Sequence, residues 1–173
     1  MTFQLVFTYR KGHDVQISCP SLGSQYSVSM SHYNGAVTVT RTAPVPTHIA
    51  TFKLKHFSKS WIMFQGQEKK PLNTFLKSGV LSRYVKARCT LLSILVAQTS
   101  ISISWYVFKG QDGEEYRWRL REDGPALFKE NIPIVTYYRK YKNEDKEYLE
   151  VYDSSLQNTL DHIILTFAIM ERL

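Results

Sequence analysis

The sequence is poor in cysteine and contains none of the short motifs that mark common enzyme classes. Its two cysteines, Cys19 and Cys89, lie far apart, and such a pair forms neither a zinc-ligand spacing nor a disulfide framework. The chain contains no Gly-x-Ser-x-Gly elbow, no phosphate-binding loop and no dinucleotide fingerprint. We therefore expect no bound metal and no cofactor, and a binding protein rather than an enzyme.

The few histidines also lack a catalytic or metal-ligand spacing. Two of them sit beside an aspartate, and adjacent residues on a strand point to opposite faces. His162 opens an apolar segment, where a packed or capping histidine is more common than a catalytic base. A catalytic site assembled from distant residues stays open as an alternative. The histidines are His13, His32, His48, His56 and His162.

Long apolar runs without polar residues are lacking too. The N-terminal stretch MTFQLVFTYRKGHD has its positive charges after its apolar part and no small-residue cleavage site, which disfavours a signal peptide. Residues 90–108 carry no charge, but glutamine, threonine and four serines dilute them, and the alternation of Ile101, Ile103 and Trp105 predicts a strand. The two cysteines are expected to be reduced thiols, so the chain is expected to be cytoplasmic. It is also expected to lack a transmembrane span and to lie peripherally at membranes.

Alternating apolar and polar residues run through most of the chain. The clearest case is the stretch 25–41, where Asn34-Gly35 separates two alternating runs and predicts a hairpin. Asp112-Gly113 predicts a second hairpin, and residues 132–142 pair with 147–152. Further strands are expected at 49–57 and 61–64, and a helical turn within 71–79. The pattern predicts one domain over residues 1–173 with about ten to twelve short strands in a sandwich or barrel.

The segment TLDHIILTFAIM, residues 159–170, is apolar on every side if it is wound as a helix. A helix of this kind is a buried one. Asn158 or Thr159 would cap its N-terminus, and Asp161 would lie favourably in its first turn. A short buried strand is the alternative, although a helix is favoured. A buried helix among many strands predicts a closed antiparallel β-barrel with this C-terminal helix inside it.

Several stretches carry a resemblance to a known superfamily. They are EEYRWRL, LFKENIPIVTYYRK, EYLEVY and LDHIILTFAIMERL, which together span about the last sixty residues. They are similar to a group of small basidiomycete fungal domains in the Tubby C-terminal-like superfamily, which includes LURP-one-related proteins and phospholipid scramblases. The resemblance implies a barrel around a C-terminal helix, and implies no activity. Residues 89–104 look like an insertion relative to that group: an extra strand, a lid or a translated intron.

The formal net charge of +7 favours anionic partners. In YRWRLR, three arginines alternate with Tyr116, Trp118 and Leu120, so they share the opposite face. Cross-strand pairing with Glu147 or Glu150 is the structural explanation, and binding of anionic lipid or phosphoinositide headgroups is the functional one. The basic residues that such alternations place on shared faces are Lys53, Lys55, Lys86, Arg88, Arg117, Arg119, Arg121, Lys140 and Lys142.

These features favour a non-enzymatic binding domain for anionic lipid or phosphoinositide at a membrane surface. Two other functions stay open: a protein-interaction adaptor, and a small-molecule enzyme using the mouth of the barrel. Nucleic-acid binding is less favoured, because the eleven tyrosines are better explained as strand and core residues than as stacking platforms. The sequence does not define an oligomeric state.

Overall fold

The computed structural model describes residues 2–9, 14–54, 60–83, 101–121, 124–139 and 147–172. In these residues it has thirteen β-strands and one α-helix, with three short 3₁₀ turns. The strands are β1 (Phe3–Tyr9), β2 (Val15–Cys19), β3 (Ser24–Met30), β4 (Val37–Ala43), β5 (Thr47–Lys53), β6 (Trp61–Phe64), β7 (Lys70–Pro71), β8 (Lys77–Arg83), β9 (Ile101–Lys109), β10 (Glu115–Arg119), β11 (Ala126–Lys129), β12 (Ile132–Tyr138) and β13 (Glu147–Val151). The 3₁₀ turns are η1 (Pro20–Leu22), η2 (Leu72–Thr74) and η3 (Ser154–Thr159), and the helix is α1 (Leu160–Met170).

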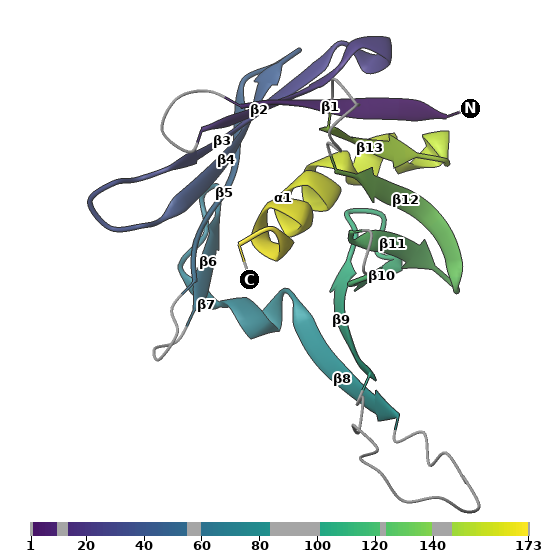
Figure 1. Ribbon diagram of the computed structural model, residues 1–173. Helices are drawn as coiled ribbons and strands as arrows, with labels where there is room; N and C mark the ends of the chain where they lie inside the picture. Colours follow the sequence, from purple (N-terminus) through teal and green to yellow (C-terminus); the bar gives the residue numbers. More distant parts are fainter. Residues whose placement is uncertain are drawn as a thin grey trace, which may run out of the picture.

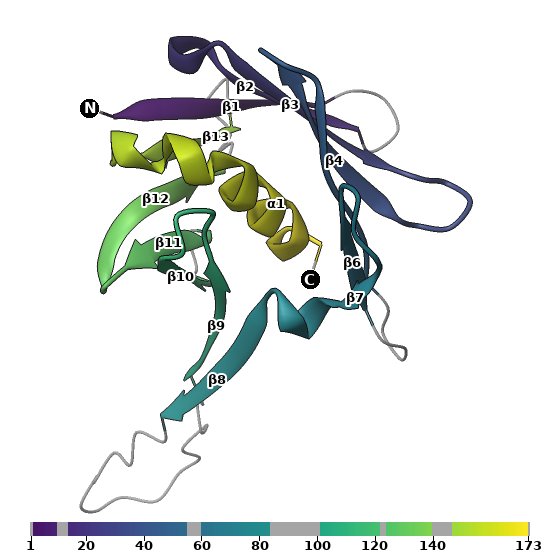
Figure 2. The same ribbon diagram turned by 180° about the vertical axis from the view of Figure 1, so that it is seen from behind.

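All thirteen strands belong to one antiparallel sheet, which curves around α1 (Figures 1 and 2). The order is β7-β6-β5-β4-β3-β2-β1-β13-β12-β11-β10-β9-β8. Two meanders in chain order, β1 to β7 and β8 to β13, are joined by the pairing of β1 with β13. This pairing puts the first and the last strand of the chain side by side in the middle of the sheet.

The predicted closure of the sheet into a barrel is not confirmed. In the described part of the chain, β7 and β8 form the two edges of the sheet and are not hydrogen-bonded to each other. β7 is only two residues long, and its Pro71 has no backbone N–H to donate. The chain then passes through η2 directly to β8, which leaves an open seam between the two edges. The predicted relation of sheet to helix is right, and the expected strand number is too low.

The helix prediction for the C-terminal segment is confirmed, and a strand is excluded. Nine of the eleven residues of α1 are buried, with no exposed side. Thr159 is the N-cap residue as expected, but its side chain makes no capping hydrogen bond. The preceding turn η3 continues directly into α1 and is itself capped by the Asp153 carboxylate, which accepts from the backbone N–H of Ser155.

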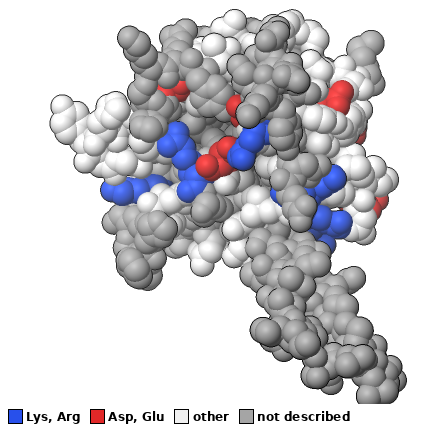
Figure 3. Space-filling view, viewed as in Figure 1, with Lys and Arg blue, Asp and Glu red and all other residues white. Residues whose placement is uncertain are grey.

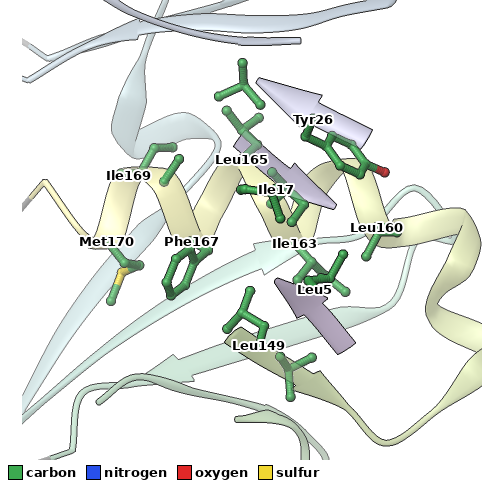
Figure 4. Packing of buried hydrophobic residues seen from close by; sticks show 14 of the residues in the cluster. Leu5, Ile17, Tyr26, Leu149, Leu160, Ile163, Leu165, Phe167, Ile169 and Met170 are labelled. Atoms are coloured by element: carbon green, nitrogen blue, oxygen red, sulfur yellow. The ribbon is translucent and has the colours of Figure 1, made fainter. Parts of the chain in front are cut away.

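The inner faces of the strands supply the rest of the core. Alternate residues of each strand point inward, so that Leu5, Ile17 and Leu149 are fully buried against α1. Figure 4 shows that Leu165 and Ile169 leave one side of the helix and Phe167 and Met170 the other. Because both sides of the helix meet strands, the apolar segment needs no solvent-facing side.

The two predicted hairpins are confirmed, with one correction. β3 pairs with β4 across Asn34-Gly35, and β9 pairs with β10 across Asp112-Gly113. Only Gly35 of the first pair has a positive φ, 65°, so this loop is not the two-residue turn that requires positive φ at both positions. The Asn34 side chain instead accepts a hydrogen bond from the N–H of Ala36.

The expected helical turn within 71–79 is found as η2. Of the stretch 89–104, residues 101–104 belong to β9, which agrees with the predicted strand there. Residues 84–100 lie outside the described part of the chain, so the insertion stays a prediction.

One buried hydrogen bond ties α1 to the sheet. The indole N–H of Trp118 donates to Oγ1 of Thr166 at 2.9 Å, and that hydroxyl donates to the carbonyl of His162. Both residues have no exposed surface. The contact between α1 and the sheet is therefore apolar here except at Thr166. Its hydroxyl accepts a hydrogen bond from the indole N–H, which is the only polar group of the Trp118 side chain.

Thr166→Val is expected to destabilise the protein by about 1–3 kcal/mol, because it leaves the Trp118 indole N–H buried without an acceptor. Thr166→Ser is the control: it keeps the hydroxyl and removes one methyl, a loss of about 0.8 kcal/mol. Urea unfolding gives both free energies. Hydrogen exchange of the Trp118 indole proton should accelerate in the valine variant more than in the serine variant, and equal exchange in both would show that the hydrogen bond contributes nothing.

Candidate functional site

Two of the predicted arginines lie on the outer face of β10. Tyr116 and Trp118 point inward and are 1% and 0% exposed, so Arg117 and Arg119 point outward. The predicted continuation of this alternation to Leu120 and Arg121 is wrong. β10 ends at Arg119, the Leu120 side chain is exposed, and the carbonyl of Arg121 accepts a hydrogen bond from the N–H of Gly124.

Both outward arginines rest on aromatic rings. The guanidinium of Arg117 lies 5.1 Å from the ring centre of Trp105, and that of Arg119 lies 4.3 Å from the ring centre of Phe128. A guanidinium over the face of an aromatic ring is attracted by the ring electrons, which restricts its position. Its N–H groups lie in the plane of the guanidinium and can still bind an anionic oxygen at the edge.

The acidic partners predicted for these arginines are wrong. Glu147 and Glu150 lie on β13, whereas β10 pairs with β9 and β11. Glu147 instead accepts a hydrogen bond from the Tyr137 hydroxyl.

The structure gives the two arginines weaker partners. Arg117 has Glu115 at 3.8 Å, on its own strand, and both side chains are well exposed. Arg119 donates to the neutral side chain of Asn131 at 2.6 Å. An exposed ion pair of this length stabilises a protein by less than about 1 kcal/mol. The positive charge of this face is therefore only weakly compensated by these partners.

The basic face continues across β9 to β8. On the adjacent strands β8, β9 and β10, Val107 stands opposite Lys77 on one side and opposite Arg117 on the other. The side chains of these three residues therefore share one face of the sheet. Arg119 stands opposite Trp105 in the same way.

A second basic and aromatic group lies on the other side of the open seam. Lys53 stands opposite Trp61 on β5 and β6, and it points away from the buried Phe52. The ammonium group of Lys69 lies 4.7 Å from the ring centre of Trp61. The two strand groups that flank the seam, β5 to β7 and β8 to β10, thus both carry lysine or arginine beside tryptophan.

We use the name seam surface for the outward-facing basic and aromatic residues on the strands that flank the seam. On the face seen in Figure 3, Lys and Arg side chains lie in more than one group, and acidic side chains lie beside the central group. The seam surface consists of Lys53, Trp61, Lys69, Lys77, Trp105, Arg117, Arg119 and Phe128. The other basic candidates from the sequence, Lys55, Lys86, Arg88, Lys140 and Lys142, lie outside the described residues.

A polar cluster at the N-terminal end of α1 was not found from the sequence. The Asp161 carboxylate accepts from the Tyr26 hydroxyl at 3.1 Å and forms an ion pair with Arg41 at 3.3 Å. Burial, and then the nearby Asp161 carboxylate, raise the pKa of Tyr26. No sequence signal joins these three residues, because they come from three elements far apart along the chain.

Beside this cluster lies a polar hollow of 450 Å³ lined by Arg41, Gln111, Asp112, Gln157, Asn158 and Asp161. Asp112 accepts from the Tyr116 hydroxyl at 2.6 Å and from the N–H of Glu114. Burial disfavours the charged Asp112, but these hydrogen bonds outweigh it and lower its pKa. A carboxylate with a lowered pKa is a poor general base near neutral pH. The polar side chains around the hollow are therefore better suited to holding the N-terminal end of α1 in place than to acid–base catalysis.

The packed role predicted for His162 is confirmed. Its ring lies near the rings of Phe64 and Phe75, with centre distances of 6.0 and 5.5 Å. Burial lowers the pKa of His162, and Nδ1 lies 3.2 Å from the carbonyl oxygen of Lys109. The neutral ring therefore donates to that carbonyl. Within the described ranges, no three His, Cys, Asp or Glu side chains are grouped as a metal site.

The fold and its outer face define a class of protein: an antiparallel sheet curved around a buried C-terminal helix, with basic and aromatic side chains flanking the open seam. Residues 11–173 match a family of unknown function, DUF6593, and the chain belongs to that family. No curated protein and no solved structure matches the chain. None of the helices in the described segments is long and apolar enough to cross a membrane.

Proposed function

We propose that the protein is a non-enzymatic binding domain that attaches to anionic lipid at a membrane surface through the seam surface. The observation that carries this proposal is the pair Arg117 and Arg119, both outward on β10, stacked on aromatic rings and only weakly compensated by Glu115 and Asn131. Such an arrangement presents fixed positive charge without burying it.

The aromatic residues favour a membrane over a soluble anion. Trp61 and Trp105 are only partly buried and lie on the two sides of the seam. Tryptophan has an apolar body and a polar N–H, and it is enriched where a protein meets the lipid headgroup region. Lys69 and Arg117 on these rings would meet phosphate while the rings meet the upper part of the acyl chains.

The resemblance to the Tubby C-terminal-like superfamily is part of the same proposal. A curved antiparallel sheet around a C-terminal helix is consistent with that superfamily. Closure of the sheet into a barrel would require β7 and β8 to pair in another state of the protein. A cytoplasmic location, peripheral to a membrane, follows from the proposal rather than from any targeting signal.

The Arg117→Gln/Arg119→Gln variant is expected to bind vesicles about thirtyfold more weakly than wild type, because each basic residue near an anionic surface contributes about 1 kcal/mol. Co-sedimentation with phosphatidylcholine vesicles, with and without phosphatidylserine, measures the effect. Wild-type binding should require phosphatidylserine and should fall as ionic strength rises from about 0.05 to about 0.5 M, since the Debye length shortens.

Two further variants separate charge from general damage. Arg117→Lys/Arg119→Lys keeps both charges and should retain most of the binding, whereas Glu115→Gln removes the acid beside Arg117 and should strengthen it. All variants should melt within a few degrees of wild type, because exposed pairs stabilise little. Wild-type protein that ignores phosphatidylserine vesicles at low salt would disprove the proposal, and unchanged binding by the glutamine variant would exclude this surface.

A further inference from the structure

A cavity of 310 Å³ lies between the last turn of α1 and the inner faces of β1, β2 and β3. Its wall includes Phe7, Ile17 and Val28 from the three strands, and Phe167 and Ala168 from the helix. These strand residues lie on one face, because Phe7 stands opposite Ile17 and the neighbouring Val15 stands opposite Val28. The cavity is therefore built by regular elements rather than by a loop.

The wall is apolar and reaches into the core. Each of the five wall residues named above is 7% exposed or less. Water in such a space would find few of the two to four hydrogen-bond partners it needs, so an apolar group is the better occupant. The volume is at the lower end of the range of about 300–1,000 Å³ that is usual for small-molecule sites.

The rim of the cavity is charged. Glu171 and Arg172 follow α1 directly and line the opening. The guanidinium of Arg172 already donates to the sulfur of Met30 at 3.3 Å, on the neighbouring end of β3. Glu171 is exposed as a whole residue, while its carboxyl group loses part of its hydration to the atoms around it.

The surroundings of Glu171 favour a positive partner. Loss of hydration raises the pKa of Glu171, and the nearby Glu147 raises it further, while Arg139 and Arg172 act in the opposite direction. Of the two charged residues that line the opening, Arg172 already donates to Met30, whereas Glu171 is the exposed one that a ligand can reach. A cation at the mouth would pair with the Glu171 carboxylate, whereas an anion placed there would be repelled by Glu171 and Glu147.

We propose that this cavity binds a small hydrophobic amine, with its apolar part against Phe7, Phe167 and Ala168 and its ammonium group at the Glu171 carboxylate. Most of the net positive charge of the chain opposes a cation only weakly, because charges beyond the Debye length of about 8 Å are screened at physiological salt. Arg139 and Arg172 lie nearer and reduce the attraction that Glu171 and Glu147 exert. This site is separate from the seam surface and does not depend on membrane binding.

Three compounds with the same alkyl tail and different head groups, namely octylamine, octanol and octanoate, show which head group the site prefers. Their binding is measured by calorimetric titration and by the ligand-induced rise in melting temperature. Octylamine should bind most tightly. Glu171→Gln should weaken octylamine about tenfold or more, since a charge-assisted hydrogen bond is lost, and should change octanol little. Glu68→Gln, an exposed glutamate that is not part of the cavity, is the charge-matched control and should bind octylamine like wild type.

The pH dependence has a defined sign. The amine binds the charged form of Glu171, so binding should weaken as the pH falls through the pKa of Glu171. Because that pKa is raised, the loss should begin at a higher pH than for an ordinary glutamate. In Glu171→Gln the remaining affinity should vary much less over the same pH range.

Ala168→Leu should fill the cavity and abolish binding of all three compounds while unfolding stays cooperative. If this variant does not fold, Val28→Ile fills part of the same space with one added methylene and should weaken all three. Octanoate binding as tightly as octylamine, unchanged binding in the filled variants, or no binding of octylamine to the wild-type protein would each overturn the proposal.

Discussion

Deletion of residues 160–173 is expected to leave a chain that no longer unfolds cooperatively. α1 contributes seven large apolar side chains that are at most 6% exposed. At roughly 1.5–3 kcal/mol for each fully buried side chain, their loss is of the same size as the roughly 5–15 kcal/mol that stabilises a typical domain. The inner face of the sheet, including Leu5, Ile17 and Trp118, would then be exposed to water.

Three measurements test the deletion. The urea transition should become broad or disappear, the near-ultraviolet circular dichroism should be lost, and the chain should bind the dye ANS, as expected when packing is lost. A chain ending at Met170 is the control, because it keeps all of α1 and should unfold cooperatively. A sharp urea transition in the chain that lacks α1 would disprove the central role of the helix.

The position of α1 could be predicted from the sequence because the signal is local. Every turn of the segment 160–170 is apolar, and a helix with no polar side has to be enclosed. The hairpins at Asn34-Gly35 and Asp112-Gly113 are likewise encoded within a few residues. Features that depend on neighbouring residues in the chain were therefore predicted well.

Closure of the sheet could not be predicted in the same way. It depends on whether β7 and β8, which are separated by one 3₁₀ turn, can pair across the sheet edges. β7 is only two residues long and contains a proline, and both features oppose this pairing. Neither feature can be recognised as decisive from the sequence, because other strand-like runs lie nearby.

The candidate site was predicted in part for a similar reason. Alternation alone places Arg117 and Arg119 on one face of a strand, and this is confirmed. The partners of the arginines depend on strand order, which alternation does not contain, so Glu147 and Glu150 were wrongly expected beside them. The cluster of Tyr26, Arg41 and Asp161 was missed altogether, because it forms only when β3, β4 and α1 come together.

Phe167→Ala is expected to lower the free energy of unfolding by about 3–5 kcal/mol, the usual cost of removing a buried phenylalanine. Phe167 is 3% exposed. Its ring centre lies 5.2 Å from that of Phe7, 5.0 Å from that of Tyr137 and 6.0 Å from that of Trp118. These three aromatic residues belong to β1, β12 and β10, so this one side chain connects the helix to both meanders of the sheet.

Phe128→Ala is the matched control, because it removes the same side chain from the outer face of β11, where Phe128 is only partly buried. Its cost should be well below that of Phe167→Ala, since much of its ring is already in contact with water. Urea unfolding gives both values, and the slope of the transition should be similar in the two variants if each still unfolds in one step. Equal costs for the two substitutions would mean that Phe167 is no more enclosed than a surface residue, and the helix could not then be the centre of the core.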